Sequence, residues 1–154
     1  MTTIYSVDAR IETPVADTEV TDRVIDAVEA LFPDVEVHSE PGRVVAETHS
    51  LQGFSDRLHD QEILDTARRE FLENADEEGF SFALKKQAAY EGVVNFAVGE
   101  PDELGEITVT VTVREPSVEE YVDHVAPPTR DGTPVNPDGD GRGGSSGPGS
   151  AGER

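Results

Sequence analysis

The segment from residue 107 to residue 113, ITVTVTV, alternates strictly between apolar and hydroxyl side chains. Successive side chains of a β-strand point to opposite faces, so the aliphatic residues fall on one face and the threonines on the other. Such a strand packs a core on one side and meets water on the other, as strands of antiparallel sheets commonly do. The segment therefore predicts an antiparallel sheet that is covered on one face.

Other segments share this period of two. They are residues 3–13, residues 34–40 and 43–49 on either side of Pro41-Gly42, residues 80–84, and residues 94–98. The pair around Pro41-Gly42 predicts a hairpin in which His38 lies opposite Val45.

Three segments instead have helical spacing of apolar residues. The first is predicted to be capped by Asp17 or Thr18 and to stop at Pro33, and the second to run from residue 55 or 60 to residue 73. The third opens at Pro116-Ser117, where Ser117 and Glu120 have capping-box spacing. The predicted order is βαββαβββα. It describes an α+β fold with a mostly antiparallel sheet of about six strands and helices on one face.

Composition divides the chain into two parts. Residues 1–126 have the size and apolar content of a single α+β domain, whereas residues 127–154 are rich in Gly, Pro and Ser. A segment with so little to bury does not offset its ordering entropy, so we expect a disordered tail.

The chain carries 33 acidic and 12 basic residues, a formal net charge of -21, spread over its whole length. Dispersed carboxylates hydrate strongly and keep molecules apart, which is typical of cytoplasmic proteins of salt-adapted organisms. The absence of cysteine excludes disulfides, thiolate metal sites and a cysteine nucleophile. No apolar run approaches the roughly 20 residues of a membrane span.

No catalytic constellation is evident, and we expect no enzymatic activity, cofactor or metal. His38 and His49 lie near acidic residues, but the hairpin register separates them, so a solvated face is the favoured interpretation. In the tail, residues 136–141 imitate the start of a calcium loop. The twelfth position is Gly147, where such a loop needs a bidentate glutamate.

Only two lysines occur, side by side at positions 85 and 86. Two further candidates follow the lysines closely, and three polar residues recur at spacings of four and seven along the second predicted helix. Together these seven residues form the candidate RNA-binding set. A cationic area of this kind would contact phosphates or bases. The competing interpretation has these side chains paired with carboxylates or located at a subunit interface. The candidates are Arg57, Gln61, Arg68, Lys85, Lys86, Gln87 and Tyr90.

Four ordered blocks carry a family resemblance: "QEILDTAR", "ALKKQAAYEGVVNF", "LGEITVTV" and "YVDHVAPPT". Over residues 3–129 the chain resembles the uncharacterised archaeal protein family 0201. The resemblance implies a fold similar to the large-subunit ribosomal protein that binds 5S RNA, dimerisation and RNA binding. The chain departs from the family at Asp60, where a basic residue is usual, and at Lys85, where asparagine is usual.

Three functional hypotheses follow. The first is an RNA-binding protein, associated with the ribosome or translation, in which short-range contacts such as Tyr90 stacking on an unpaired base overcome the negative charge. The second is a homodimeric protein-interaction module. The third, and least supported, is an enzyme or binder of a small phosphorylated metabolite.

Overall fold

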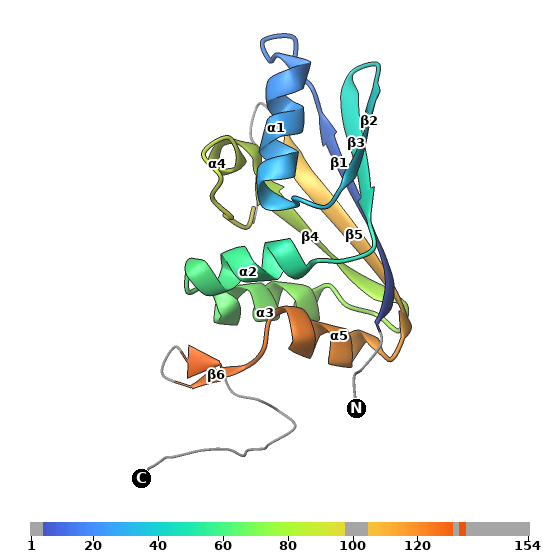
Figure 1. The fold of residues 1–154 in the computed structure, drawn as a ribbon, viewed down its shortest axis with the longest axis vertical. Coiled ribbons are helices and arrows are strands. Elements are labelled where there is room, and N and C mark those ends of the chain that lie inside the picture. Colours follow the sequence, from blue (N-terminus) through green and yellow to red (C-terminus); the bar gives the residue numbers. More distant parts are fainter. Residues whose placement is uncertain (1–4, 98–104, 131–132, 135–154) are drawn as a thin grey trace.

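The computed structural model describes residues 5–97, 105–130 and 133–134, and it contains a five-stranded sheet in the order β2-β3-β1-β5-β4 (Figure 1). All four strand pairs are antiparallel. The predicted α+β class is confirmed. The strands are β1 (Ser6–Pro14), β2 (Glu36–Glu40), β3 (Arg43–Thr48), β4 (Gly79–Lys85) and β5 (Glu106–Glu115).

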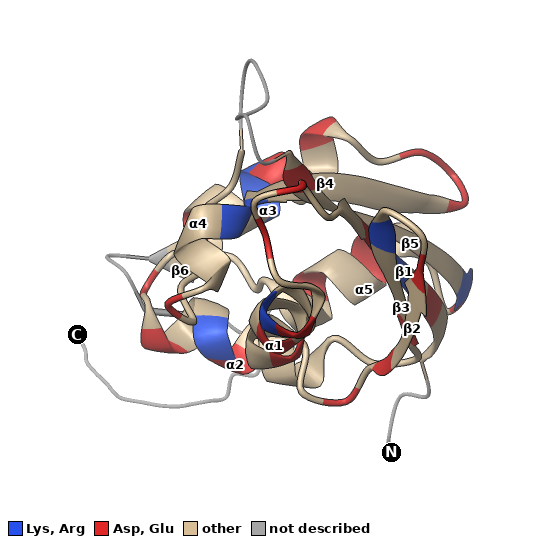
Figure 2. Ribbon diagram, turned by 90° about the horizontal axis from the view of Figure 1, so that it is seen from above, with Lys and Arg blue, Asp and Glu red and all other residues tan. Residues whose placement is uncertain are grey.

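The helices lie on one face of this sheet (Figures 1 and 2). They are α1 (Thr21–Leu31), α2 (Gln52–Asp60), α3 (Leu64–Glu73), α4 (Lys86–Ala89) and α5 (Val118–Val125). A separate pair, β6 (Thr129–Arg130) and β7 (Thr133–Pro134), follows α5, so the first residues beyond the predicted boundary at 126 include a short hairpin. The remainder of the predicted tail lies outside the described residues.

Strand β5 has the predicted alternation. Its aliphatic side chains, from Ile107 to Val113, are buried against the helices, and its three threonines are exposed on the opposite face. The β2–β3 hairpin also has the predicted register, with His38 opposite Val45. In α5, the Ser117 side chain accepts a hydrogen bond from the Glu120 backbone N–H, as the capping spacing predicts.

The predicted sixth strand, residues 94–98, is wrong over the residues that the structure describes. Val94 and Phe96 are buried, but the segment forms only one isolated bridge, between Leu84 and Phe96. The backbone of Val94 is paired with the amide side chain of Gln61 rather than with a neighbouring strand. Burial of alternate residues therefore reflects a core-lining loop here. Val98 lies outside the described residues.

The second predicted helix is in fact two helices, with a break at residues 61–63 where Glu62 adopts a left-handed φ of 59°. The buried faces explain the break. A continuous helix would place Leu64 about 120° around the axis from Leu58, because each residue adds about 100°. The apolar residues of α3 would then point well away from those of α2, and the break returns both faces to the core.

The first helix begins at Thr21, three residues beyond the nearer predicted cap at Thr18, and its N-cap, Val20, makes no side-chain hydrogen bond. Residues 16–19 form a turn in which the Glu19 backbone N–H donates to the Ala16 carbonyl oxygen. The Glu19 carboxylate in turn accepts from the Ala16 N–H at 2.8 Å. The acidic side chain before the helix thus closes the preceding turn.

Candidate nucleic-acid interface

The two adjacent lysines point to opposite faces of the sheet. Lys85 lies on the face away from the helices and is half-exposed, whereas Lys86 continues the buried side of β4 and is only 1% exposed. The alternation Phe80, Phe82, Leu84 already placed position 86 on the core side, a signal that sequence reasoning missed. Contrary to expectation, Lys86 is thus not part of an RNA-facing surface.

The ammonium group of Lys86 is paired inside the protein. Its Nζ donates to the Pro14 carbonyl oxygen at 2.5 Å and to a Glu19 carboxylate oxygen at 2.9 Å. The exposed fractions of the Lys86 and Glu19 side chains are 0% and 5%. An unpaired buried ammonium would cost several kcal/mol, so the fold depends on this partner. The Lys86–Glu19 pair joins the end of β1 and the turn before α1 to α4.

Glu19 also accepts a hydrogen bond from the Tyr90 hydroxyl. Burial of the Glu19 carboxylate opposes its ionisation, but the hydrogen bonds from Ala16, Tyr90 and Lys86 together outweigh burial and hold the pKa of Glu19 below its ordinary value. Burial and the neighbouring carboxylate raise the pKa of Tyr90. At neutral pH the cluster is therefore a carboxylate with an ammonium and a neutral phenol, and it fixes the Tyr90 ring beside α1.

The contribution of Glu19 to stability is expected to depend on pH. Because its pKa is lowered on folding, that contribution is fully present above the ordinary value of 4.5 and is lost as pH falls through the folded-state pKa. The unfolding free energy of wild type minus that of Glu19→Gln, measured by urea denaturation, should be constant above about pH 5.5 and shrink below pH 4.5. Glu29→Gln, an exposed change on α1, is the control, and a pH-independent Glu19 difference would contradict the buried ion pair.

Arg57 and Gln61 do not lie in an open basic row. The Arg57 guanidinium donates to the Gly92 carbonyl oxygen at 2.6 Å. The Gln61 amide donates to the Val94 carbonyl oxygen at 3.0 Å and accepts from the Val94 N–H at 2.8 Å. These two side chains hold the segment after α4 against α2, contrary to the expectation that they face RNA.

Arg68 is directed elsewhere, because the break before α3 separates it from Arg57 and Gln61. Its guanidinium donates to the Asp123 carboxylate at 2.5 Å and to the Ala126 carbonyl oxygen at 3.2 Å. Both charged side chains are about one quarter exposed. Arg68 therefore joins α3 to the end of α5, and the predicted stripe of long polar side chains does not form.

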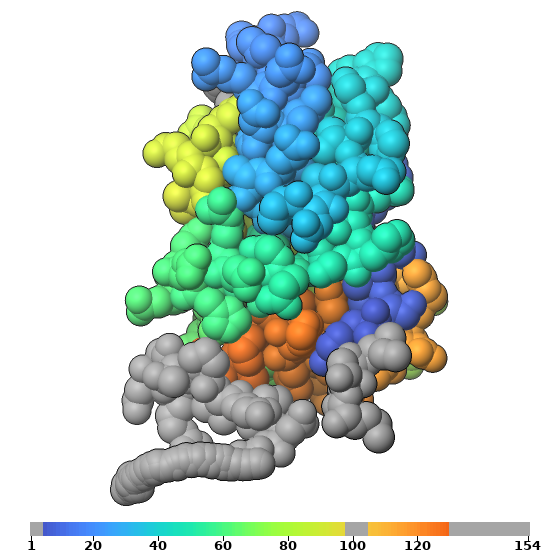
Figure 3. Space-filling model, in the orientation of Figure 1, coloured from blue at the N-terminus to red at the C-terminus, as the bar shows by residue number. Residues whose placement is uncertain are grey.

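Three of the seven predicted residues remain at the surface around α4. Lys85 is partly buried, Gln87 is exposed, and Tyr90 is 38% exposed. Tyr90 also borders a cavity of about 880 Å³ between α1 and α4, two helices that lie against one another (Figure 3). This α1–α4 groove is lined by Thr18, Glu19, Val20, Arg23, Asp26, Ala27, Ala30 and Tyr90.

Arg23 is the residue that sequence reasoning missed. It is exposed, it is the sole basic residue of α1, and no ion pair joins it to a carboxylate among the described residues. A lone arginine in an acidic helix was the available signal. Arg23 and Tyr90 line the same groove.

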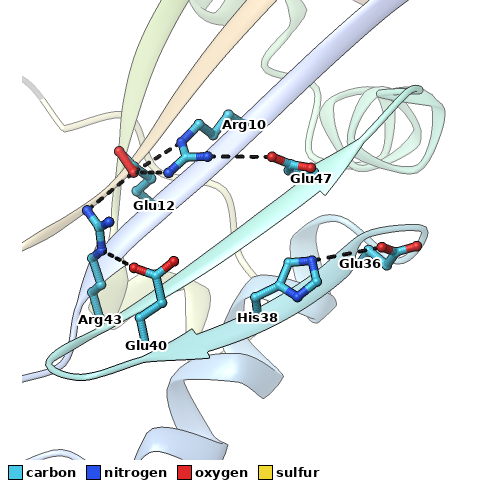
Figure 4. A network of polar contacts seen from close by, with 7 residues as sticks. All are labelled: Arg10, Glu12, Glu36, His38, Glu40, Arg43 and Glu47. Carbon is cyan, nitrogen blue, oxygen red and sulfur yellow. Dashed lines mark hydrogen bonds and ion pairs between the residues drawn. The ribbon is translucent and has the colours of Figure 1, made fainter.

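The open face of the sheet has arginines too, but they are neutralised (Figure 4). Arg10 contacts Glu12 at 2.9 Å, and Arg43 contacts Glu40 at 2.8 Å. On β5, Arg114 contacts Asp8 at 2.6 Å. These cations are already bonded to carboxylates, which makes this face a weaker candidate for phosphate contacts than the groove.

Acidic residues occur on nearly every element, and the basic ones are few (Figure 2). Within the described ranges no cluster of three or more His, Asp or Glu residues is arranged to hold a metal ion. No helix in those ranges has the length and apolar content needed to cross a bilayer.

A family model described as RNA binding matches residues 8–114. A UPF0201 protein of Thermococcus kodakarensis is 35% identical, and the match covers 83% of this chain and 95% of that protein. The chain belongs to the UPF0201 family. The family description names RNA binding and no reaction.

The fold of this UPF0201 chain is similar to a solved relative. The crystal structure of a UPF0201 protein from Methanococcus jannaschii is 30% identical, with a TM-score of 0.78 over 84% of this chain and 99% of that chain. A UPF0200/UPF0201 protein of Archaeoglobus fulgidus is 37% identical over 84% of this chain. This chain spans only 40% of that relative's length and 55% of the Methanopyrus kandleri UPF0201 protein.

Proposed function

We propose that this UPF0201 chain binds RNA through the α1–α4 groove and the adjoining surface of α4. One observation carries the proposal: Arg23 and the partly exposed Tyr90 line the same groove. An arginine and an aromatic ring are the pair of side chains that single-stranded RNA sites combine. The matched RNA-binding model, residues 8–114, includes both α1 and α4, and its description supports the proposal.

Three residues make the contacts in this proposal. Gln87 and Tyr90 are retained from the sequence prediction and Arg23 is added, whereas Lys85 is left out because it lies on the opposite face of the sheet. Lys86 supports the surface from beneath, and Arg57 and Gln61 hold the segment that follows α4. Arg68 has no part in it, since it joins α3 to α5.

Charge decides the conditions under which this surface can work. Helix α1 carries Asp22, Asp26 and Glu29, and the whole chain has a net charge of -21, so its long-range field repels phosphates. In molar salt the Debye length falls to about 3 Å, and only contact-range interactions persist. We propose that the protein works in concentrated salt and binds RNA through bases more than phosphates. Association with the ribosome is a finer proposal, tested by co-sedimentation with ribosomal subunits.

Arg23→Glu is expected to weaken RNA binding by about tenfold or more, because one good arginine contact is worth about 1–3 kcal/mol and 1.4 kcal/mol is a factor of ten. Fluorescence anisotropy with labelled single-stranded RNA in molar potassium chloride measures the effect. Arg69→Glu, an identical charge change at an exposed position on α3 outside the groove, is the matched control. Equal losses for both variants would count against the groove, and no binding by wild type would refute the function.

The predicted homodimer remains a proposal, and one feature favours it. The β4–β5 half of the open face presents small uncharged side chains in neighbouring rows, namely Ser81, Ala83, Thr108, Thr110 and Thr112. A second copy could pack there without bringing carboxylates together. Light scattering of wild type and Thr110→Glu in concentrated salt tests this, and a monomeric wild type would reject it.

A further inference from the structure

We propose that the α1–α4 groove selects an unpaired guanine base. The inference rests on the proposed RNA-binding function and goes beyond it by naming the base and the groups that recognise it. It depends on three side chains that line the same groove: Arg23 and Asp26 from α1, and Tyr90 from the end of α4.

Arg23 and Asp26 lie side by side on one wall of the groove. They are three residues apart in α1, which places them on the same side of the helix. Both are exposed, and no ion pair between them is formed. A donor group and an acceptor group are therefore both available to one ligand.

Tyr90 supplies a ring for stacking whose position is already fixed. Its hydroxyl donates to Glu19, and Glu19 is fixed by the Lys86 ammonium and the Ala16 N–H. Tyr90 nevertheless remains 38% exposed, and it lines the groove. A ring held in place before binding loses little conformational freedom when a base stacks on it, so more of the stacking free energy, about 1–3 kcal/mol per base, is kept.

Guanine matches the polar pair best. Its Watson–Crick edge presents the O6 acceptor beside two donors, N1–H and the N2 amino group. The Arg23 guanidinium can donate to O6, and the Asp26 carboxylate can accept from both donors at once, since an ionised carboxylate has two acceptor oxygens. Adenine and cytosine each offer one amino donor on this edge, and uracil offers one ring N–H. None of these three gives a carboxylate two adjacent donors.

The space and the charge around the groove leave room for a base. A cavity of about 880 Å³ falls within the range of roughly 300–1,000 Å³ seen for small-molecule sites. Its α1 wall includes Ala27 and Ala30, whose short side chains leave room for a flat ring. Glu19 and Asp26 disfavour phosphate inside the groove, so the sugar-phosphate backbone lies outside it and contacts few cations.

The test compares labelled oligouridylates that carry one guanosine, inosine, adenosine or uridine at the centre, by anisotropy in molar potassium chloride. Guanosine should raise affinity about tenfold over uridine, and inosine, which lacks the N2 amino group, should lose most of that gain. Asp26→Asn should reduce the guanosine-to-uridine ratio toward one. Asp22→Asn, the same change on α1 outside the groove lining, should leave the ratio unchanged.

The guanosine-to-uridine affinity ratio is the decisive readout. Removal of a negative charge raises the affinity for every RNA by a common factor, and this factor cancels in the ratio. Tyr90→Phe, which keeps the ring, should retain binding, and Tyr90→Ala should lose it, with circular dichroism confirming that both fold. An unaltered ratio in Asp26→Asn, or equal binding of inosine and guanosine, overturns the guanine proposal and leaves RNA binding standing. Absence of binding to every oligonucleotide refutes both.

Discussion

Replacement of Lys86 by methionine is expected to lower the free energy of unfolding by about 3–5 kcal/mol, the usual cost of removing one partner from a buried ion pair. The Glu19 carboxylate, only 5% exposed, would lose its cation. The Pro14 carbonyl oxygen would lose its donor. Methionine fills a similar volume, so the loss reports the missing charge more than a cavity. Urea denaturation followed by circular dichroism, at one fixed salt concentration, measures the change.

The neighbouring lysine provides the control. Lys85→Met removes the same charge at a half-exposed position whose side chain makes no hydrogen bond or ion pair in the described part of the chain. It should change stability by about 0.5 kcal/mol or less. The double variant Lys86→Met/Glu19→Met should recover much of the single loss, because no uncompensated charge remains. Similar losses for the two lysine variants would contradict the buried pair.

Phe71→Ala is expected to cost about 3–5 kcal/mol of stability, the range for truncating a buried phenylalanine. Phe71 is fully buried on α3. Its ring centroid lies 4.9 Å from that of Phe80 and 4.8 Å from that of Phe82. It also makes an edge contact with Phe96 at 6.1 Å. The substitution leaves a cavity between α3 and β4 and removes a contact with the segment that follows α4.

Leu72→Ala is the matched control, since Leu72 is the next residue of α3 and is 43% exposed. It should cost well under 1 kcal/mol. Phe71→Leu should fall between the two, because leucine refills part of the space. Thermal unfolding followed by circular dichroism ranks the stability of the three variants. If Phe71→Ala loses no more stability than Leu72→Ala, the Phe71 ring is not a main packing element of the core.

Period-two and helical patterns predicted much of the fold. Strand β5, the β2–β3 register and the cap of α5 follow from local rules, because the direction of each side chain is set by its own backbone. The same rules failed at Val94 and Phe96, which are buried although they belong to a loop and not to a strand. They also failed at residues 61–63, where no glycine or proline signals the break. The two errors have different causes: Val94 finds its hydrogen-bond partner in the distant Gln61, whereas the break at 61–63 keeps two buried helical faces on the core.

The candidate site was predicted less well. Side-chain type and spacing grouped Arg57, Gln61 and Arg68, but their partners are Gly92, Val94 and Asp123, each more than thirty residues away. Arg23 was overlooked because its neighbour Tyr90 is distant in the chain. Gln87 and Tyr90 are exposed at the surface, as the prediction requires, and Lys85 is partly buried.

The sequence by itself determined the two-sided strands, the helical faces, the acidic surface and the four blocks of residues that indicated its family. It could not determine which charged side chains are free, because that depends on which carboxylates and carbonyl oxygens the fold brings within hydrogen-bonding distance. Tertiary structure alone directed Lys86 to Glu19 and left Arg23 in the groove. The period of two in β4 already implies which of the two neighbouring lysines faces the core, because a β-strand turns successive side chains to opposite sides, but only the fold supplies the carboxylate that makes its burial possible.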